Sequence, residues 1–293
     1  MEWIQYRGQD SMMKKMVMLC ITILFVVCAM TGYGFYRAVK TPANNAEAFL
    51  KAKIDPSKKI AVLMGDSLTH GAVSYNYVEE LSKDHDVSHF IFINEGINSQ
   101  FAYHQLNKVD QVAGAKPHEI LILIGTNDCR ATLSAAEYER FNALWKLPVQ
   151  PTQEWYAHNL KTLVDKLKEK TRARITLISI PPLGEKVDSI PFQKSIEYSH
   201  DIKRIAEEKN VGYIALNEAL TEAIIKNGRK DIKGYELDLR SMYGAIFSHY
   251  LLLQSWDDIS DQRGLLFLTD HLHLNRRGGN ILITKIKERL LSK

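Results

Sequence analysis

An uncharged stretch from Met16 to Tyr36 constrains this chain more than any other feature of its sequence. It reads MVMLCITILFVVCAMTGYGFY, with Lys14 and Lys15 before it and Arg37 after it. At about 1.5 Å per residue, a helix of this length would measure roughly 31 Å, close to the thickness of the hydrocarbon core of a bilayer. The sequence therefore predicts one N-terminal transmembrane helix.

A cleaved signal peptide is the alternative, because the most apolar part, residues 16–30, also has the length of a signal-peptide core. A buried core helix is a third interpretation. Residues 29–31 offer no convincing cleavage site, and the residues before Cys28 lack the small side chain that lipid attachment requires. We therefore expect residues 1–15 to be a short N-terminal segment and residues 16–36 to be an uncleaved signal-anchor helix.

The basic residues that flank the apolar segment do not decide its orientation, because both sides carry them. A single anchor before a large domain usually leaves the short N-terminus inside. We therefore expect the rest of the protein outside the cytoplasm, anchored at a bacterial cell surface, or secreted if the segment is cleaved. Polar residues and the Asp55-Pro56-Ser57 breaker predict a linker over residues 37–57, followed by one domain over residues 58–293.

The composition excludes several classes of protein. The chain carries 38 Lys and Arg against 34 Asp and Glu, and a net charge of +4 is too small and too mixed to favour nucleic acid as a partner. With 45% hydrophobic residues it can bury a core, which excludes a disordered or collagen-like chain. Cys129 is the only cysteine outside the apolar segment, so the domain can form no internal disulfide.

Short apolar runs alternate with helical patterns along the rest of the chain. Runs of this kind suit strands buried on both faces of a parallel sheet, and they occur at residues 60–64, 90–93, 120–124, 175–180 and 213–216. Helical spacing separates or follows them at residues 154–170, 196–209 and 277–291. The pattern predicts a three-layer α/β/α sandwich with a five-stranded, mostly parallel sheet.

The first predicted strand leads directly into Gly65-Asp66-Ser67-Leu68-Thr69-His70-Gly71. This places Ser67 where a strand turns into a helix, so its hydroxyl can face outward beside the backbone N–H groups of the helix N-terminus. The alternative is a serine that only caps the helix. The segment lacks the second glycine of the Gly-x-Ser-x-Gly turn, which disfavours the α/β-hydrolases.

Polar residues also follow the next two predicted strands. Gly96 lies in Asn-Glu-Gly-Ile-Asn-Ser at 94–99 and would let the backbone approach a ligand, although a glycine there is most often a turn. Asn127 lies in Gly-Thr-Asn-Asp at 125–128 and supplies an amide donor, although such an Asn often bonds only its own loop. Ligands collect at this edge of a parallel sheet, which favours the functional interpretation.

Near the C-terminus, Asp270 and His273 stand three residues apart in Asp-His-Leu-His-Leu-Asn at 270–275. One turn of a loop can bring the carboxylate to Nδ1 of the imidazole while Nε2 faces a serine hydroxyl. A helix cap with a solvated histidine pair is the alternative. A metal site from Asp270, His271 and His273 is a further one, but no matching ligand cluster appears elsewhere.

Together, these four blocks resemble the SGNH hydrolases, also called GDSL esterases and lipases, over residues 58–291. The resemblance implies the flavodoxin-like sandwich and a serine esterase without a cofactor. It implies Ser67 as nucleophile, His273 as general base and acid, and Asp270 as its orienting partner. It also implies an oxyanion hole from the Ser67 and Gly96 N–H groups and the Asn127 side chain. His271 is the second choice of base, although its spacing from Asp270 does not match the family.

The expected substrate is a carboxylic ester, such as an acyl or acetyl ester of a lipid or surface glycan, cleaved through an acyl-serine intermediate. An acyltransferase of the same fold and a non-catalytic cell-envelope scaffold are the alternatives. Two stretches look like insertions in a minimal domain, residues 136–153 and 230–263. In the second, an apolar stripe predicts an amphipathic helix that packs on the sheet; the alternative is a lid or a membrane-facing wall.

Overall fold

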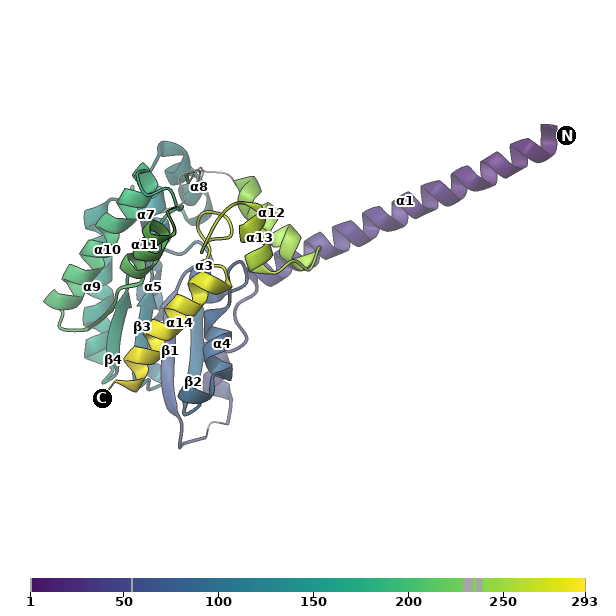
Figure 1. Ribbon diagram of the computed structural model, residues 1–293. Coiled ribbons are helices and arrows are strands. Elements are labelled where there is room, and N and C mark those ends of the chain that lie inside the picture. The colour runs from purple at the N-terminus through teal and green to yellow at the C-terminus, as the bar shows by residue number, and fades with distance from the viewer. Residues whose placement is uncertain (1, 54, 229–233, 236–238, 293) are drawn as a thin grey trace.

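The computed structural model describes residues 2–53, 55–228, 234–235 and 239–292. Residues 230–233 and 236–238, which belong to the second expected insertion, lie outside the described residues. A long helix, α1 (Glu2–Val39), projects from an α/β domain that contains the rest of the chain (Figure 1).

The domain is built on a five-stranded sheet in which every pair of neighbouring strands is parallel. Its strands are β1 (Lys59–Gly65), β2 (Phe90–Gly96), β3 (Glu119–Leu123), β4 (Arg174–Ile178) and β5 (Gly212–Ile214). The strand order is β2-β1-β3-β4-β5, so the direction of winding reverses between β1 and β3. In such sheets the crevice at this reversal, outside the carboxyl ends of the strands, is where ligands bind. The predicted sheet is confirmed, with strand ends that shift by one to three residues.

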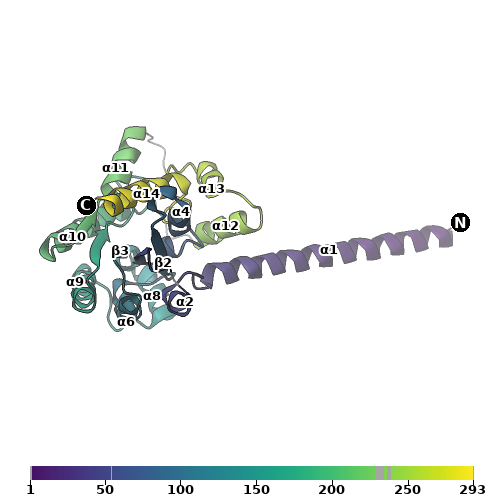
Figure 2. The same cartoon turned by 90° about the horizontal axis from the view of Figure 1, so that it is seen from below.

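Side chains alternate between two cores, one on each face of the sheet. Val62 and Met64 of β1 enter one core, whereas Ala61 and Leu63 enter the other. The first face is covered by α2 (Ala46–Lys51), α5 (Ala102–Gln105), α6 (Val109–Gly114), α9 (Gln153–Lys170) and α10 (Ile190–Glu208). The second face is covered by α4 (Tyr77–Lys83), α11 (Leu216–Asn227) and α14 (Arg276–Leu291) (Figure 2). This is the predicted three-layer sandwich.

The three predicted helices correspond to α9, α10 and α14. The second of them, α10, begins at Ile190, six residues earlier than the apolar pattern indicated. Pro191 stands in its first turn, where the missing N–H of proline leaves no hydrogen bond unmade. The apolar pattern missed this early start because the first turn of the helix is favoured by proline and not by apolar spacing.

The remaining helices surround the carboxyl edge of the sheet. They are α3 (Ser67–His70), α7 (Thr126–Ala131), α8 (Ala135–Trp145), α12 (Leu239–Tyr250) and α13 (Trp256–Gln262). Short 3₁₀ turns lie elsewhere, at His85–Val87 before β2 and at Leu106–Lys108. The helix α12 is the predicted amphipathic one. The expectation that it packs on the sheet is wrong, because its main contacts are with α1 and α13 (Figure 2).

The helix α1 contains the predicted apolar segment. The most apolar 18 residues between Met12 and Arg37 have a mean hydropathy of 2.3, and this part of the helix is long and apolar enough to cross a membrane, although a signal sequence would share these properties. The stretch after α1 lies close against the domain. Asn44 accepts a hydrogen bond from the Asn94 N–H and donates to the Phe92 carbonyl, both on the edge strand β2. Consequently, the end of α1 is held close to the sheet.

The turn from β1 to α3 should tolerate no side chain at Gly65. A Cβ there would lie 2.5 Å from the carbonyl oxygen of Leu123 and would overlap with the side chain of Thr69. We expect Gly65→Ala to lower the free energy of unfolding by about 1–3 kcal/mol or more. In Gly114→Ala, the new Cβ would make ordinary contacts with Leu50, so it should cost nothing measurable. Denaturant unfolding would test both, and equal stabilities would contradict the prediction.

Candidate active site

Ser67 is presented by a tight turn between β1 and α3. Asp66 caps this short helix, because its Oδ1 accepts a hydrogen bond of 3.0 Å from the N–H of Leu68. Ser67 is the first residue of α3, so its own N–H is one of the groups at a helix N-terminus that have no partner within the helix. The turn therefore places a hydroxyl and a backbone donor at the carboxyl end of β1.

His273 connects Ser67 to Asp270. Its Nε2 lies 2.8 Å from Oγ of Ser67, and its Nδ1 lies 2.8 Å from Oδ2 of Asp270. A carboxylate can only accept, so Nδ1 carries the proton and Nε2 accepts from the serine hydroxyl. The structure thus brings together the three residues expected to act as nucleophile, base and orienting acid. The second choice of base, His271, is not the histidine that contacts Ser67.

Asp270 is held as an ionised acceptor. Its Oδ1 accepts the backbone N–H of His273 at 2.8 Å and that of Leu272 at 3.2 Å. Burial by itself raises the pKa of Asp270, but the charge and hydrogen bonds of His273 outweigh it and leave this pKa below its usual value. An ionised Asp270 fixes the ring orientation in which Nε2 faces Ser67.

The loop before Asp270 is held by Glu185, a buried residue that the sequence analysis did not single out. Its carboxylate accepts the backbone N–H groups of Leu266, Phe267 and Leu268 at 2.7, 2.8 and 2.9 Å. Three consecutive backbone N–H groups thus donate to one carboxylate, which lies about 80 residues earlier in the chain. Glu185 therefore positions the segment that carries Asp270 and His273, and no sequence motif indicates this role because its partners are backbone atoms.

Asn127 lies at the start of α7, where it lines the same pocket as Ser67 and His273. Its Nδ2 donates to the Gln100 carbonyl at 3.0 Å and, at a longer 3.4 Å, to Oδ2 of Asp66. Its Oδ1 accepts from Arg130. This fixes the amide so that its nitrogen faces the Ser67 turn, as expected for an oxyanion donor.

Gly96 has a different role from the one expected. Its N–H donates to Oδ1 of Asn94 at 2.9 Å, and Gly96 is not among the residues that line the pocket. A Cβ at this position would overlap with the backbone of Thr69 and His70. The glycine is therefore needed for the close approach of α3 to β2, and the geometry does not support it as an oxyanion donor. Ser99, three residues later, does line the pocket and has a φ of 60°.

Residues 63–280 match the model of the GDSL-like Lipase/Acylhydrolase family. This range includes every residue of the hydrogen-bonded group around Ser67. The chain belongs to this family. It is accordingly a carboxylic ester hydrolase of the GDSL, or SGNH, type. No curated protein sequence matches it.

Solved structures with the same fold include two acetylxylan esterases. One, from Geobacillus stearothermophilus, is 16% identical, covers 81% of this chain and 96% of its own, and has a TM-score of 0.54. The other, the acetyl xylan esterase AlAXEase, is 18% identical, covers 79% of this chain and 100% of its own, and has a TM-score of 0.56. At such identities the likeness extends to the fold alone.

The catalytic pocket of this GDSL-family esterase has a volume of about 920 Å³. Its polar side includes Arg130 and Arg140, which converge on the buried Glu137 at 3.1 and 2.8 Å. The Tyr235 hydroxyl donates to Glu137 and accepts from Arg130, both at 2.8 Å. The helix α8, which lies mostly within the first expected insertion, contributes Leu144 and Trp145 to the pocket wall. No motif predicted this cluster, in which the charged residues of α7 and α8 meet a tyrosine from a distant part of the chain.

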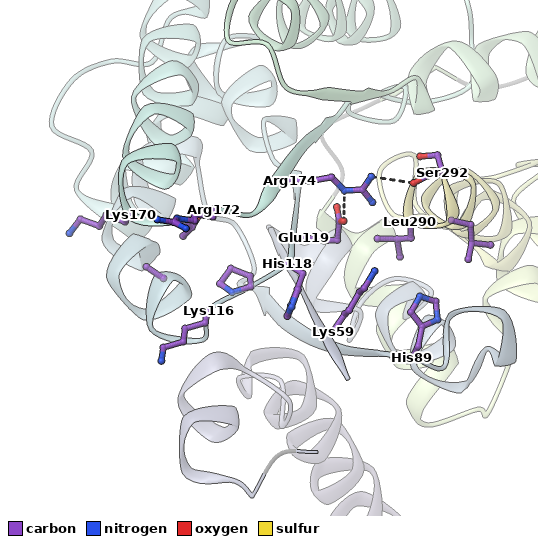
Figure 3. A pocket seen from close by; sticks show the side chains of 14 residues that line it. Lys59, His89, Lys116, His118, Glu119, Lys170, Arg172, Arg174, Leu290 and Ser292 are labelled. Atoms are coloured by element: carbon purple, nitrogen blue, oxygen red, sulfur yellow. Dashed lines mark hydrogen bonds and ion pairs between the residues drawn. The ribbon is translucent and has the colours of Figure 1, made fainter. Parts of the chain in front are cut away.

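A second cavity, of about 820 Å³, lies at the opposite edge of the sheet (Figure 3). It is lined by basic side chains near the amino ends of β1 and β4, among them Lys59, Arg172 and Arg174. Arg174 pairs with Glu119 at 2.6 Å. The cavity contains none of the residues around Ser67, so it lies apart from the esterase site.

The carboxyl group of Asp66 should make stability depend on pH. Burial raises the pKa of Asp66 to about 6, from 3.8 in the unfolded chain. The folded state therefore binds this proton more tightly, and stability falls as the pH rises from about 4 to 6. Asp66→Asn can still cap α3 and has no proton to lose. We expect its stability relative to wild type to improve by on the order of 2–3 kcal/mol between pH 4 and pH 7. Unfolding curves that keep a constant offset would contradict this.

Proposed function

We propose that this esterase cleaves a carboxylic ester through an acyl-serine intermediate, with Ser67 as nucleophile. The observation that carries the proposal is the continuous hydrogen-bonded chain from Ser67 through His273 to Asp270. A serine hydroxyl is a weak nucleophile until a neighbouring base accepts its proton, and such a base is in contact with Ser67. This arrangement needs no cofactor.

In the first half-reaction, His273 takes the Ser67 proton while Oγ attacks the ester carbonyl carbon. The tetrahedral intermediate then collapses, the bond to the alcohol oxygen breaks, and His273 returns the proton to the leaving alcohol. In the second half-reaction, water gives its proton to His273 and attacks the acyl-serine, which releases the carboxylic acid and restores Ser67. Asp270 stays ionised and stabilises the imidazolium in both steps.

The negative charge of the intermediate is stabilised by two donors, the Ser67 N–H and Nδ2 of Asn127. The N–H lies at a helix N-terminus, and the Asn127 amide exchanges its long contact to Asp66 for the oxyanion. Gly96 supports this oxyanion hole indirectly, because its lack of a side chain lets α3 pack closely on β2.

We also propose that α1 is an uncleaved anchor that holds the domain at the outer surface of a bacterial membrane. Gly34, two residues before the end of the apolar segment, is buried, and a Cβ built on it would lie 3.5 Å from Cβ of Tyr250 in α12. Cleavage after the apolar segment would remove a helix that packs on the domain. The proposed division is residues 1–15, the membrane helix at 16–36, a connecting stretch at 37–57, whose helix α2 packs on the sheet, and the catalytic domain at 58–293.

Replacement of the nucleophile should abolish turnover without affecting folding. We expect Ser67→Ala to lose ester hydrolysis and covalent labelling by a serine-directed phosphonate, with an unchanged circular dichroism spectrum. Ser82→Ala, in which the lost hydroxyl only bonds a carbonyl of its own helix, should keep both. Labelling that persists in Ser67→Ala would identify a different nucleophile.

Loss of the Asn127 amide should slow the chemical step. Removal of one oxyanion donor typically lowers kcat by about a hundredfold or more, so we expect that effect in Asn127→Ala. The matched control is Asn107→Ala, at an exposed position in a 3₁₀ turn, which should be neutral. Steady-state kinetics on a 4-nitrophenyl ester would measure the effect, and a change under about threefold would remove Asn127 from the hole.

A further inference from the structure

The last turns of the membrane helix form part of the wall of the catalytic pocket. Met30, Thr31, Gly34 and Phe35 of α1 line the same cavity as Ser67. All four belong to the apolar segment that is long enough to cross a bilayer. The segment that anchors the protein therefore also shapes its active site.

Two hydrogen bonds connect this wall to the turn that carries the nucleophile. Nε2 of His70, in α3, lies 2.8 Å from the carbonyl oxygen of Lys40, just after α1. The Tyr250 hydroxyl, in α12, donates to the carbonyl of Ala72 at 2.6 Å. Since α12 also packs along α1, the two helices and the segment around Ser67 are in contact with one another. The apolar wall is thus held in a defined position relative to the reacting hydroxyl.

The charges along α1 place this wall at the edge of the membrane. From Lys15 to Arg37 the helix rises about 33 Å, slightly more than the roughly 30 Å of a hydrocarbon core. Tyr33, Tyr36 and Arg37 are residue types that favour the membrane interface. Met30 lies about 10 Å below Arg37 along the helix axis. The α1 side of the pocket is therefore at the depth of the outermost acyl-chain carbons.

The second wall of the pocket carries apolar side chains that face solvent in the described structure. Tyr243 and Phe247 of α12 line the pocket and are exposed, and Leu252 and Leu253 just beyond the helix are more exposed still. An amphipathic helix with such residues next to a membrane anchor binds in the plane of the interface. Both walls of the pocket would then open toward lipid.

We propose that the substrate is a lipid ester of the same membrane, whose acyl chain enters the pocket from the bilayer between α1 and α12. This inference rests on the proposed function. A volume of about 920 Å³ lies near the upper limit of small-molecule sites, far more than an acetyl group needs. The polar groups at Arg130, Arg140 and Asn127 lie in the same pocket and suit the ester and its alcohol portion.

A surface glycan fits this pocket less well. Sugar hydroxyls need hydrogen-bonding partners, and removing them from water without such partners is costly. The walls from α1 and α12 present mainly aliphatic and aromatic side chains to the space above Ser67. Such walls gain free energy by covering an acyl chain, since the gain scales with the apolar area removed from water.

The test uses the full chain reconstituted in phosphatidylcholine vesicles, with 4-methylumbelliferyl palmitate in the bilayer and 4-methylumbelliferyl acetate in the buffer. We expect Phe35→Ser to lower kcat/KM for the palmitate at least tenfold while the acetate value changes less than twofold. Tyr36→Ser, on the neighbouring exposed position that does not line the pocket, is the matched control and should leave both values unchanged. Retained acetate hydrolysis shows that each variant is folded.

A second variant tests the pocket by filling it. Thr31→Trp should shift the preferred substrate in a series of 4-methylumbelliferyl esters from long to short acyl chains. Equal losses on palmitate and acetate in Phe35→Ser, or equal effects of Phe35→Ser and Tyr36→Ser, would overturn the inference. So would wild-type hydrolysis of acetate without palmitate, which would favour a glycan acetate. Absence of Ser67-dependent hydrolysis of both esters would contradict the proposed function itself.

Discussion

The hydrogen bond between Ser67 and His273 is the contact on which the rest of this structure depends. Its two partners lie 206 residues apart, one after the first strand and the other before the last helix. A distance of 2.8 Å between them requires that the whole sheet and both of its helical layers be in place. The parallel sheet makes this possible because it brings the ends of its strands to a single edge.

Buried polar groups keep that edge rigid. Glu185 gathers three consecutive backbone donors of the loop before Asp270, and the Asp128 carboxyl accepts the N–H of Ala102 at the start of α5. Burial raises the pKa of Asp128 to about 8, so this group is largely protonated at neutral pH. Asp270, by contrast, stays ionised because three hydrogen-bond donors surround its carboxylate, as expected for charge in a medium of low polarity.

The apolar helix α1 was predicted from its composition, but its participation in the pocket was not. Its length, lack of charge and basic flanks are properties of consecutive residues. Its contact with α12 depends on Gly34 meeting Tyr250, more than two hundred positions away. The stripe on α12 likewise indicated a helix correctly, but hydrophobic spacing does not specify which partner covers it. For this reason the expected packing of α12 on the sheet was wrong, and α12 packs on α1 instead.

The strand and helix pattern, the sandwich and the choice of Ser67, Asn127, Asp270 and His273 as candidate site residues were all predicted from the sequence. These predictions were possible because strand periodicity is local and because the chemistry needs particular side chains at the ends of particular strands. Only the tertiary structure decided the role of Gly96, where a Cβ would overlap with the backbone of Thr69 and His70. It also decided the positioning by Glu185, the charged cluster around Glu137 and the wall from α1. Each of these depends on contacts between distant segments, and such contacts produce no periodic pattern in the sequence.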